Sequence, residues 1–236
     1  MPAAPKAPIA NHILAALPRK EYQALLPFLE SVSLAFGDVL YEPGAGIRFV
    51  YFPEDCLVSL LTAVESAQAA EVGLVGCEGM VGIPVALGIS ESPFLAVVQG
   101  NGTAWRMSAA QLRRQIAASP NLQRELFRFT HLLMTQVAQT AACNRFHVVS
   151  QRLARWLLMT RDRVISNQFL LTQEFLARML GVRRVGVTVA ASDLQKRKII
   201  RYSRGTITIL DDKALEAVSC GCYGAVKNLY AQSKVS

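Results

Sequence analysis

The sequence predicts an α+β protein: an antiparallel β-roll in the first half, one long helix, and a helix–turn–helix with a following hairpin near the end. Short β-prone runs separated by glycine and proline fill residues 32–107. Apolar residues then recur at spacings of three and four from 120 to 146, which is typical of a helix. We therefore predict a roll domain at 1–118, a long helix at 119–146, and a C-terminal domain with a helical tail at 147–236.

The roll is predicted from six short candidate strands. One or two short helices are expected before it, within residues 9–29, and turn-forming residues such as those at 42–46 and 100–102 separate the strands. The candidate strands are Val39–Tyr41, Phe49–Phe52, Leu57–Thr62, Val72–Val75, Leu95–Val98 and Thr103–Met107. Many short strands at this spacing favour an antiparallel roll or barrel.

A short helix capped by Ser108 precedes the long helix, which is predicted to run from Pro120 to about Phe146. Ser119 is a capping residue, and the proline after it suits the first helical position. The apolar stripe of the long helix could pack on its own domain, but its length favours self-association. An exposed stripe of this kind would be an aggregation hazard in a monomer, so we expect a homodimer. The residues expected at the dimer interface are Leu122, Leu126, Phe129, Leu133 and Val137.

The next elements are a helix over Val148–Val164 and two helices joined at a glycine. Thr172 is the predicted cap of the first of these two, and Gly181 supplies the left-handed residue that a tight turn needs. The second helix follows at once and continues to Lys198. A strand, a turn and a second strand come after it, up to Leu210. This order is that of a winged helix-turn-helix, which places its second helix in the major groove of DNA.

The charge distribution agrees with a polyanion partner in the second half of the chain. Residues 1–110 hold five Lys or Arg against ten Asp or Glu, whereas residues 111–236 hold twenty against seven. Residues 147–211 alone hold twelve basic residues against four acidic ones. A generic helical subdomain with a solvated basic face is the alternative, but the predicted elements favour duplex DNA.

Over residues 20–210, and most specifically around 171–210, the chain resembles the Crp/Fnr family of transcription regulators. By that resemblance Thr172 and Gln173 contact phosphates, and Arg184 matches the guanine-reading arginine. Val185 stands where the family commonly has glutamate and Val189 at a later arginine position, so sequence readout is expected to differ. The full set of expected DNA contacts is Thr172, Gln173, Arg183, Arg184, Val185, Thr188, Val189, Arg201, Ser203 and Arg204.

The resemblance also implies a cyclic-nucleotide-binding-like roll, yet the usual phosphate cassette is missing. Ile83 stands where the glutamate that holds the ribose is expected, and residues 92–95 contain no arginine. Because a buried phosphate without a cationic partner is costly, we expect no binding of cyclic AMP or cyclic GMP in the usual mode. The effector ligand stays open.

Cysteines and histidines give no clear cofactor signal, so we expect no metal and no cofactor. The oxygen-sensing branch of the family needs four cysteines for an iron–sulfur cluster, mostly near the N-terminus, and the first cysteine here is Cys56. His131 and His147 leave haem as a minor alternative. Cys143 with His147, and Cys220 with Cys222, would together make a Cys₃His set, but nothing in the sequence brings the two pairs together.

The other function classes are less well supported. The N-terminus, Met1–Pro8, does not read as a signal peptide, no apolar run is long enough for a membrane span, and five scattered cysteines favour a reducing cytoplasm. No catalytic constellation is recognisable, so we expect no enzyme. An activator would have RNA polymerase as a further partner. The main alternative is a ligand-binding signalling module that acts through a protein partner without specific DNA binding.

Overall fold

The computed structural model describes residues 9–65, 68–164 and 166–233 of the chain. The segment Met1–Pro8, on which the expectation about a signal peptide depends, lies outside these residues. The described chain forms two compact units. The first unit comprises the described residues within Met1–Val58, Val75–Ser92 and Val97–Thr130, and the second those within Ser59–Leu74, Pro93–Ala96 and His131–Ser236.

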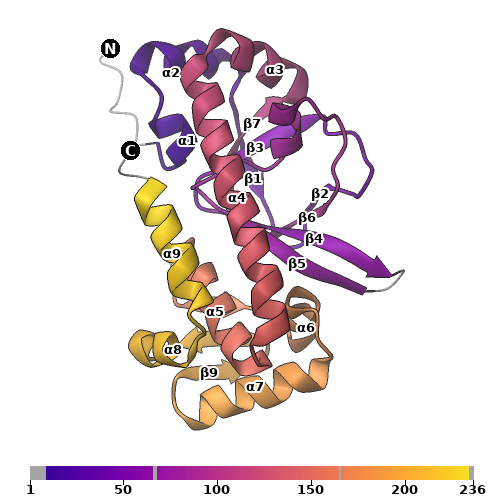
Figure 1. The fold of residues 1–236 in the computed structure, drawn as a ribbon, viewed down its shortest axis with the longest axis vertical. Helices are drawn as coiled ribbons and strands as arrows, with labels where there is room; N and C mark the ends of the chain where they lie inside the picture. Colours follow the sequence, from indigo (N-terminus) through magenta and orange to yellow (C-terminus); the bar gives the residue numbers. More distant parts are fainter. Residues whose placement is uncertain (1–8, 66–67, 165, 234–236) are drawn as a thin grey trace. The chain divides into compact units, whose positions relative to one another are not determined.

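Helices and strands follow the predicted order (Figure 1). The helices are α1 (His12–Ala15), α2 (Arg19–Leu25), η1 (Leu26–Phe28), η2 (Ile83–Leu87), α3 (Ala109–Ala118), α4 (Pro120–Phe146), α5 (Val149–Arg161), α6 (Gln173–Leu180), α7 (Arg184–Lys196), α8 (Asp212–Val218) and α9 (Cys222–Ser233). The strands are β1 (Glu30–Leu34), β2 (Val39–Tyr41), β3 (Phe49–Pro53), β4 (Leu57–Glu65), β5 (Gln68–Val75), β6 (Leu95–Gly100), β7 (Gly102–Ser108), β8 (Gln168–Leu170), β9 (Ile200–Ser203) and β10 (Thr206–Ile209). The predicted fold class, with N-terminal antiparallel sheets, a long helix and a C-terminal helix-turn-helix, is confirmed.

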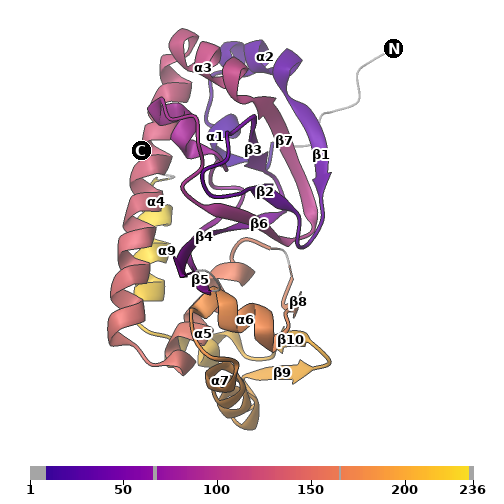
Figure 2. The same ribbon diagram turned by 90° about the vertical axis from the view of Figure 1, so that its right-hand side faces the viewer.

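Two sheets make the roll. One has the strand order β1-β7-β3, and the other has the order β2-β6-β4-β5. All six predicted strands are present, and strand β1 was missed. Its residues alternate with serine and carry little apolar signal, but β1 pairs antiparallel with β7 at the edge of the sheet (Figure 2). The register places Glu30 opposite Arg106, and the two side chains form an ion pair of 2.7 Å.

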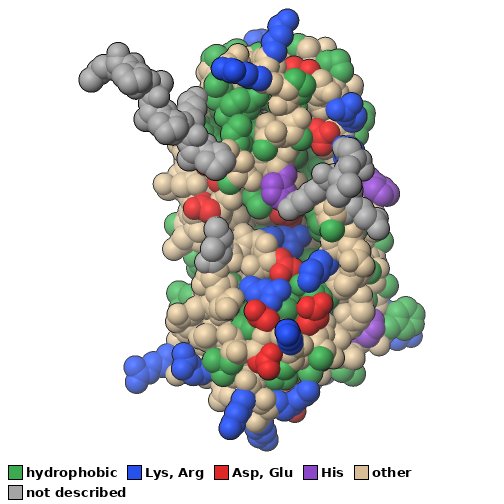
Figure 3. All heavy atoms as spheres, turned by 90° about the vertical axis from the view of Figure 1, so that its left-hand side faces the viewer, with side chains coloured by type: hydrophobic (Ala, Val, Ile, Leu, Met, Phe, Trp, Pro, Cys, Tyr) green, Lys and Arg blue, Asp and Glu red, His purple; other side chains and the backbone are tan. Residues whose placement is uncertain are grey.

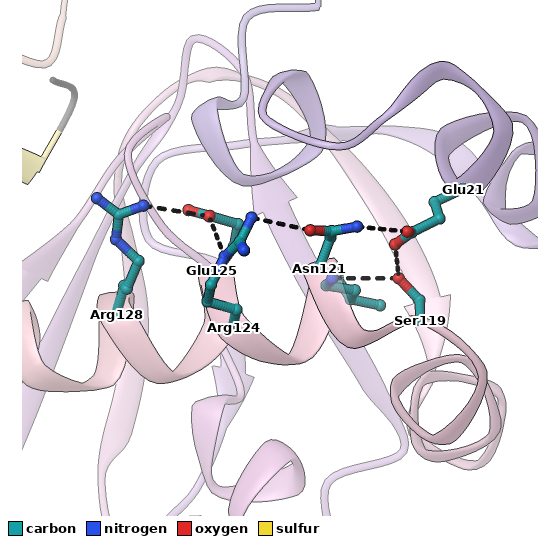
Figure 4. Close-up of polar contacts among 7 residues, drawn as sticks. Glu21, Ser119, Asn121, Arg124, Glu125 and Arg128 are labelled. Atoms are coloured by element: carbon teal, nitrogen blue, oxygen red, sulfur yellow. Dashed lines mark hydrogen bonds and ion pairs between the residues drawn. The ribbon is translucent and has the colours of Figure 1, made fainter. Parts of the chain in front are cut away.

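The first turn of α4 is fixed by polar contacts with α2 (Figure 4). The Ser119 hydroxyl accepts a hydrogen bond from the backbone N–H of Leu122 at 3.1 Å, so the predicted cap is confirmed. The same hydroxyl donates to Oε2 of Glu21, and Nδ2 of Asn121 donates to Oε1 of that carboxylate at 2.5 Å. These hydrogen bonds lower the pKa of Glu21, with the one from Ser119 contributing most. The sequence motif therefore fixes both the start of the helix and its attachment to α2.

The apolar stripe of α4 faces the interior of its own chain. This corrects the expectation that the stripe is exposed and forms the dimer interface. Leu122, Leu126 and Phe129 are 0–1% exposed, Leu133 is 6% exposed, and Val137 is half-buried. In the first unit, the ring of Phe129 fills the space beside Gly79, where an added Cβ would lie 2.1 Å from it. Because these side chains already pack within one chain, the expectation that they form an exposed stripe is wrong.

Large apolar side chains are exposed elsewhere on α4. Phe127 is 48% exposed and Met134 is 67% exposed. They lie seven residues apart, so they share a face of the helix that differs from the buried one.

Among the described residues, no helix is both long and apolar enough to cross a membrane.

Candidate nucleic-acid interface

Helix α6 begins and ends where the sequence predicts. The Thr172 hydroxyl accepts a hydrogen bond from the backbone N–H of Phe175 at 3.1 Å, which caps the helix. Gly181 ends it with φ 60° and ψ 42°, a left-handed conformation that glycine adopts at little cost. Leu176 and Leu180 are buried, and Phe175 is half-buried. The predicted tight turn between two helices is therefore confirmed.

Helix α7 presents an exposed apolar pair next to its cationic N-terminus. Arg183 is the extended residue before the helix, and Arg184 is its first helical residue. The face packed on the domain is Val187, Ala190, Ala191 and Leu194. Val185 and Val189 lie on the opposite face, one turn apart, and each is 66% exposed. A helix face that meets only water would more often carry polar residues at these positions.

Side-chain hydrogen bonds join the two helices. Oε1 of Gln173 accepts one hydrogen bond from the Thr188 hydroxyl at 2.9 Å and another from Nε of Arg184 at 3.4 Å. The Thr188 hydroxyl also lies 3.1 Å from the backbone carbonyl of Arg184. Gln173 and Thr188, both expected as DNA contacts, thus also hold Arg184 in place. This positioning role was not foreseen from the sequence.

The β9–β10 hairpin is anchored to the start of α6. The Tyr202 hydroxyl donates to the carbonyl of Leu171 at 2.8 Å, and the backbone N–H of Leu171 donates to the carbonyl of Gly205 at 2.6 Å. Burial raises the pKa of Tyr202. Arg204 and Gly205 form the turn with φ of 50° and 76°, so the arginine side chain stands at the tip of the hairpin. Strand β8 pairs with β10 and completes a three-stranded sheet.

Cationic side chains gather on this part of the second unit. Arg183 and Arg184 are exposed on α7, and Arg201 and Arg204 are exposed on the hairpin. Within the described residues none of these four forms an ion pair with a carboxylate. Figure 3 shows Lys and Arg side chains at the end of the view that carries α7 and the hairpin. The geometry therefore offers unpaired charge to a polyanion.

Sequence reasoning missed one cation near the turn. Arg178 is exposed on α6, three residues before Gly181. The exposure of Arg178 could have been predicted from the apolar residues Leu176, Met179 and Leu180. These three residues are buried and leave residue 178 on the opposite face of the helix. Ser203, an expected contact, is exposed at the end of β9, beside the tip.

The roll carries apolar or neutral residues at the positions of the missing phosphate cassette. Ile83 is 7% exposed and is the first residue of η2. Gly82 before it has φ 99°, and a Cβ there would lie 2.7 Å from the hydroxyl of Tyr41. Ser92 is buried and Phe94 is half-buried. None of Ile83, Ser92 and Phe94 carries a positive charge that could pair with a phosphate.

Comparison with known proteins agrees with this geometry. Residues 151–218 match the family model of the Crp-like helix-turn-helix domain. The structure of FixK2 from Bradyrhizobium japonicum matches with a TM-score of 0.69 and 13% identity, over 81% of this chain and 98% of that one. The chain has the Crp/Fnr fold. In sequence, it matches no curated protein.

Two further solved structures resemble the chain over most of its length. The c-di-GMP responsive global regulator CLP from Xanthomonas campestris matches with a TM-score of 0.66 and 15% identity, over 81% of this chain and 99% of that one. A CRP-family transcriptional regulator from Thermus thermophilus matches with a TM-score of 0.62 and 20% identity, over 80% and 96%. The chain thus shares the fold of these proteins, and residues 151–218 match the Crp-like helix-turn-helix domain.

Proposed function

We propose that this protein is a transcription regulator that binds specific duplex DNA through α7 and the β9–β10 hairpin. The observation that carries the proposal is the exposed face of α7, where Arg184 lies beside Val185 and Val189. A helix-turn-helix directs the N-terminal residues of its second helix at base edges in the major groove. Arg201 and Arg204 on the hairpin then lie beside the groove, where phosphates are the nearest partners.

The side chains on α7 favour a particular kind of sequence readout. Arg184 can donate two hydrogen bonds to O6 and N7 of a guanine, and its guanidinium is held by Gln173. Val185 and Val189 carry no hydrogen-bonding group, so they can select only by apolar contact, for which the thymine methyl is the partner in the major groove. We therefore expect half-sites that combine one guanine with neighbouring thymines.

The proposed regulator acts as a homodimer through the exposed face of α4. Phe127 and Met134 replace the buried leucines as the central contacts, because only exposed side chains can lose solvent contact on association. Two copies related by a twofold axis would present two α7 helices to successive half-sites on one face of the duplex.

The effector of this regulator is not a cyclic nucleotide bound in the usual mode. The buried Ile83 cannot hold a ribose hydroxyl, and neither Ser92 nor Phe94 can neutralise a phosphate. The proposal therefore assigns the roll either a different, more apolar ligand or a purely structural role.

Selection of binding sites from a random duplex library tests the proposal. The full chain should enrich a two-part site with inverted symmetry, and its affinity should fall as salt rises because phosphate contacts release counterions. The double variant Arg183→Ala with Arg184→Ala should lose the enrichment. Arg114→Ala, which removes an exposed arginine on α3, should keep it.

Equal affinity for selected and random duplexes would reject the proposal. Such a result would favour the signalling module that works through a protein partner. The salt dependence separates DNA binding as such from preference for a particular sequence, because it reports phosphate contacts even where no sequence is preferred.

A further inference from the structure

Four side chains with metal-binding atoms meet where α4 ends and α8 turns into α9. We call them the Cys₃His cluster; its members are Cys143, His147, Cys220 and Cys222. Their sulfur and nitrogen ligand atoms all lie within 4.8 Å of one another. All four belong to the second unit, and the DNA-facing residues of α7 are not among them.

The four residues form two pairs, and local backbone structure brings the two members of each pair together. Cys143 and His147 are one helical turn apart, and the backbone N–H of His147 still donates to the carbonyl of Cys143 at 3.1 Å. Cys220 and Cys222 flank Gly221 in the turn between α8 and α9. Packing of this turn on the end of α4 then joins two pairs that are far apart in the sequence.

Two of the separations match those of neighbouring ligands around one tetrahedral ion, and the rest are no longer than 4.8 Å. The sulfurs of Cys143 and Cys220 lie 3.5 Å apart, and the sulfur of Cys222 lies 3.6 Å from Nδ1 of His147. Zinc binds sulfur at about 2.3 Å and imidazole nitrogen at about 2.0–2.1 Å in tetrahedral sites. Those bond lengths place neighbouring ligand atoms roughly 3.5–3.8 Å apart. The cysteines are free thiols, so no disulfide occupies the cluster.

The three cysteines of the cluster are buried, which suits a structural metal site. Cys143 is 0% exposed, Cys220 and Cys222 are 4% and 5% exposed, and His147 is half-buried. Nε2 of Gln139 lies 3.0 Å from the sulfur of Cys222 and donates a hydrogen bond to it. Hydrogen bonds of this kind orient metal ligands and raise their affinity.

Nearby cations suit a site that carries net negative charge. Three thiolates and one divalent ion sum to a single negative charge. Arg155 and Arg152 both interact electrostatically with Cys143, so the excess charge has partners on α5. Thiolate and imidazole ligands together favour zinc over the hard cations magnesium and calcium, which prefer oxygen.

We propose that the Cys₃His cluster binds one Zn²⁺ ion per chain. On binding, the three thiols release three protons to solvent and no electrons move. The ion would fasten the α8–α9 turn, and with it the C-terminal helix, to the end of α4. The site is structural, because four protein ligands leave no open position for a substrate.

Metal content and a cobalt spectrum test the proposal on the full, reduced chain. Protein dialysed against Zn²⁺ and then against metal-free buffer should retain one zinc per chain by elemental mass spectrometry. Co²⁺ in place of Zn²⁺ should give the visible bands of tetrahedral coordination and a near-ultraviolet thiolate charge-transfer band. Removal of the metal by a chelator should lower the melting temperature, since a ligand that binds only the folded state stabilises it.

Variants separate coordination from folding. Cys220→Ser combined with Cys222→Ser should abolish the charge-transfer band, whereas Cys77→Ser, outside the cluster, should keep it. His147→Cys should restore a tetrahedral site that His147→Ala loses. Gln139→Ala should weaken Zn²⁺ binding by about 10–100-fold. Far-ultraviolet circular dichroism of each variant shows whether it is folded.

Two results would overturn the proposal. One is a reduced wild-type chain that takes up neither Zn²⁺ nor Co²⁺. The other is a Cys143–Cys220 disulfide that forms in the presence of Zn²⁺, seen as a loss of two hydrogens by mass spectrometry. Neither result bears on DNA binding, so the site stands or falls independently of the proposed function.

Discussion

Trp156 of α5 donates a hydrogen bond from its indole Nε1 to Oε1 of Glu71 on β5, at 3.0 Å. The second carboxyl oxygen of Glu71 accepts from the Ser59 hydroxyl at 2.7 Å. The carboxyl group is fully buried, and burial raises its pKa to about 8, although both hydrogen bonds and the charges of Arg155 and Arg163 act in the opposite direction. Burial therefore favours the protonated form of Glu71 at neutral pH in the folded chain.

This raised pKa predicts that the folded chain loses stability as pH rises. The pKa of Glu71 is near 4.5 when unfolded and about 8 when folded, so in between only the folded state keeps the proton. Linkage then lowers the free energy of unfolding by up to about 1.4 kcal/mol per pH unit across that window. Glu71→Gln, which imitates the protonated form, should remove this slope. Urea unfolding at a series of pH values measures it.

The matched control is Glu42→Gln, which changes an exposed acid of the first unit. It should leave the slope as in the wild type. If Glu71→Gln and the wild type lose stability in parallel as pH rises, Glu71 is ionised in the folded state and the prediction is wrong.

Arg184 and Arg204 should differ in the kind of DNA binding that they support. Arg184→Ala removes a bidentate base contact worth about 1–3 kcal/mol of discrimination, so it should weaken binding to the selected site far more than to random DNA. Arg204→Ala removes a phosphate contact, so it should weaken both about equally and lower the salt slope by about one contact. Titrations of each variant on both duplexes at several salt concentrations distinguish the two.

A parallel loss of both affinities in Arg184→Ala would contradict the proposed orientation of α7. Gln173→Ala adds an independent check, because Gln173 holds the guanidinium of Arg184. Gln173→Ala should therefore lose part of the discrimination between selected and random DNA that Arg184→Ala loses.

The dimer should depend on exposed rather than buried positions of α4. The wild type should sediment at about twice its chain mass of 25.8 kDa at micromolar concentration. Phe127→Glu with Met134→Glu should give a folded monomer, because the carboxylates would be desolvated at the interface. Ile89→Glu, which charges an apolar side chain of similar exposure outside α4, should stay dimeric. A soluble wild-type monomer would refute the assignment.

Cyclic AMP and cyclic GMP should not bind tightly. Ile83 is buried where a ribose ligand would be needed, and residues 92–95 offer no cation to the phosphate. Calorimetric titration of the full chain should therefore give no saturable heat at micromolar concentrations of either nucleotide. Micromolar affinity would mean that the phosphate is held by residues outside the usual cassette.

Local signals predicted much of the fold. The bounds of α4, the caps at Ser108, Ser119 and Thr172, and the left-handed Gly181 all follow from residues within one turn of each other. The six predicted strands follow from local alternation and turn residues in the same way. Strand β1 was missed because its residues alternate with serine and give little apolar signal, so only its pairing with β7, about 70 positions away, identifies it as a strand.

Sequence alone determined which elements form and that the second half of the chain is cationic, because periodicity, capping and charge are properties of neighbouring residues. Tertiary structure decided which face of each element is covered. It buried Leu122 and Leu126 of α4 and left Phe127 and Met134 exposed, although all four are apolar residues of one helix. It also placed Cys143 and His147, at the end of α4, against Cys220 and Cys222, in the α8–α9 turn. Contacts between distant segments depend on how whole elements pack, and no local pattern in one sequence specifies that packing.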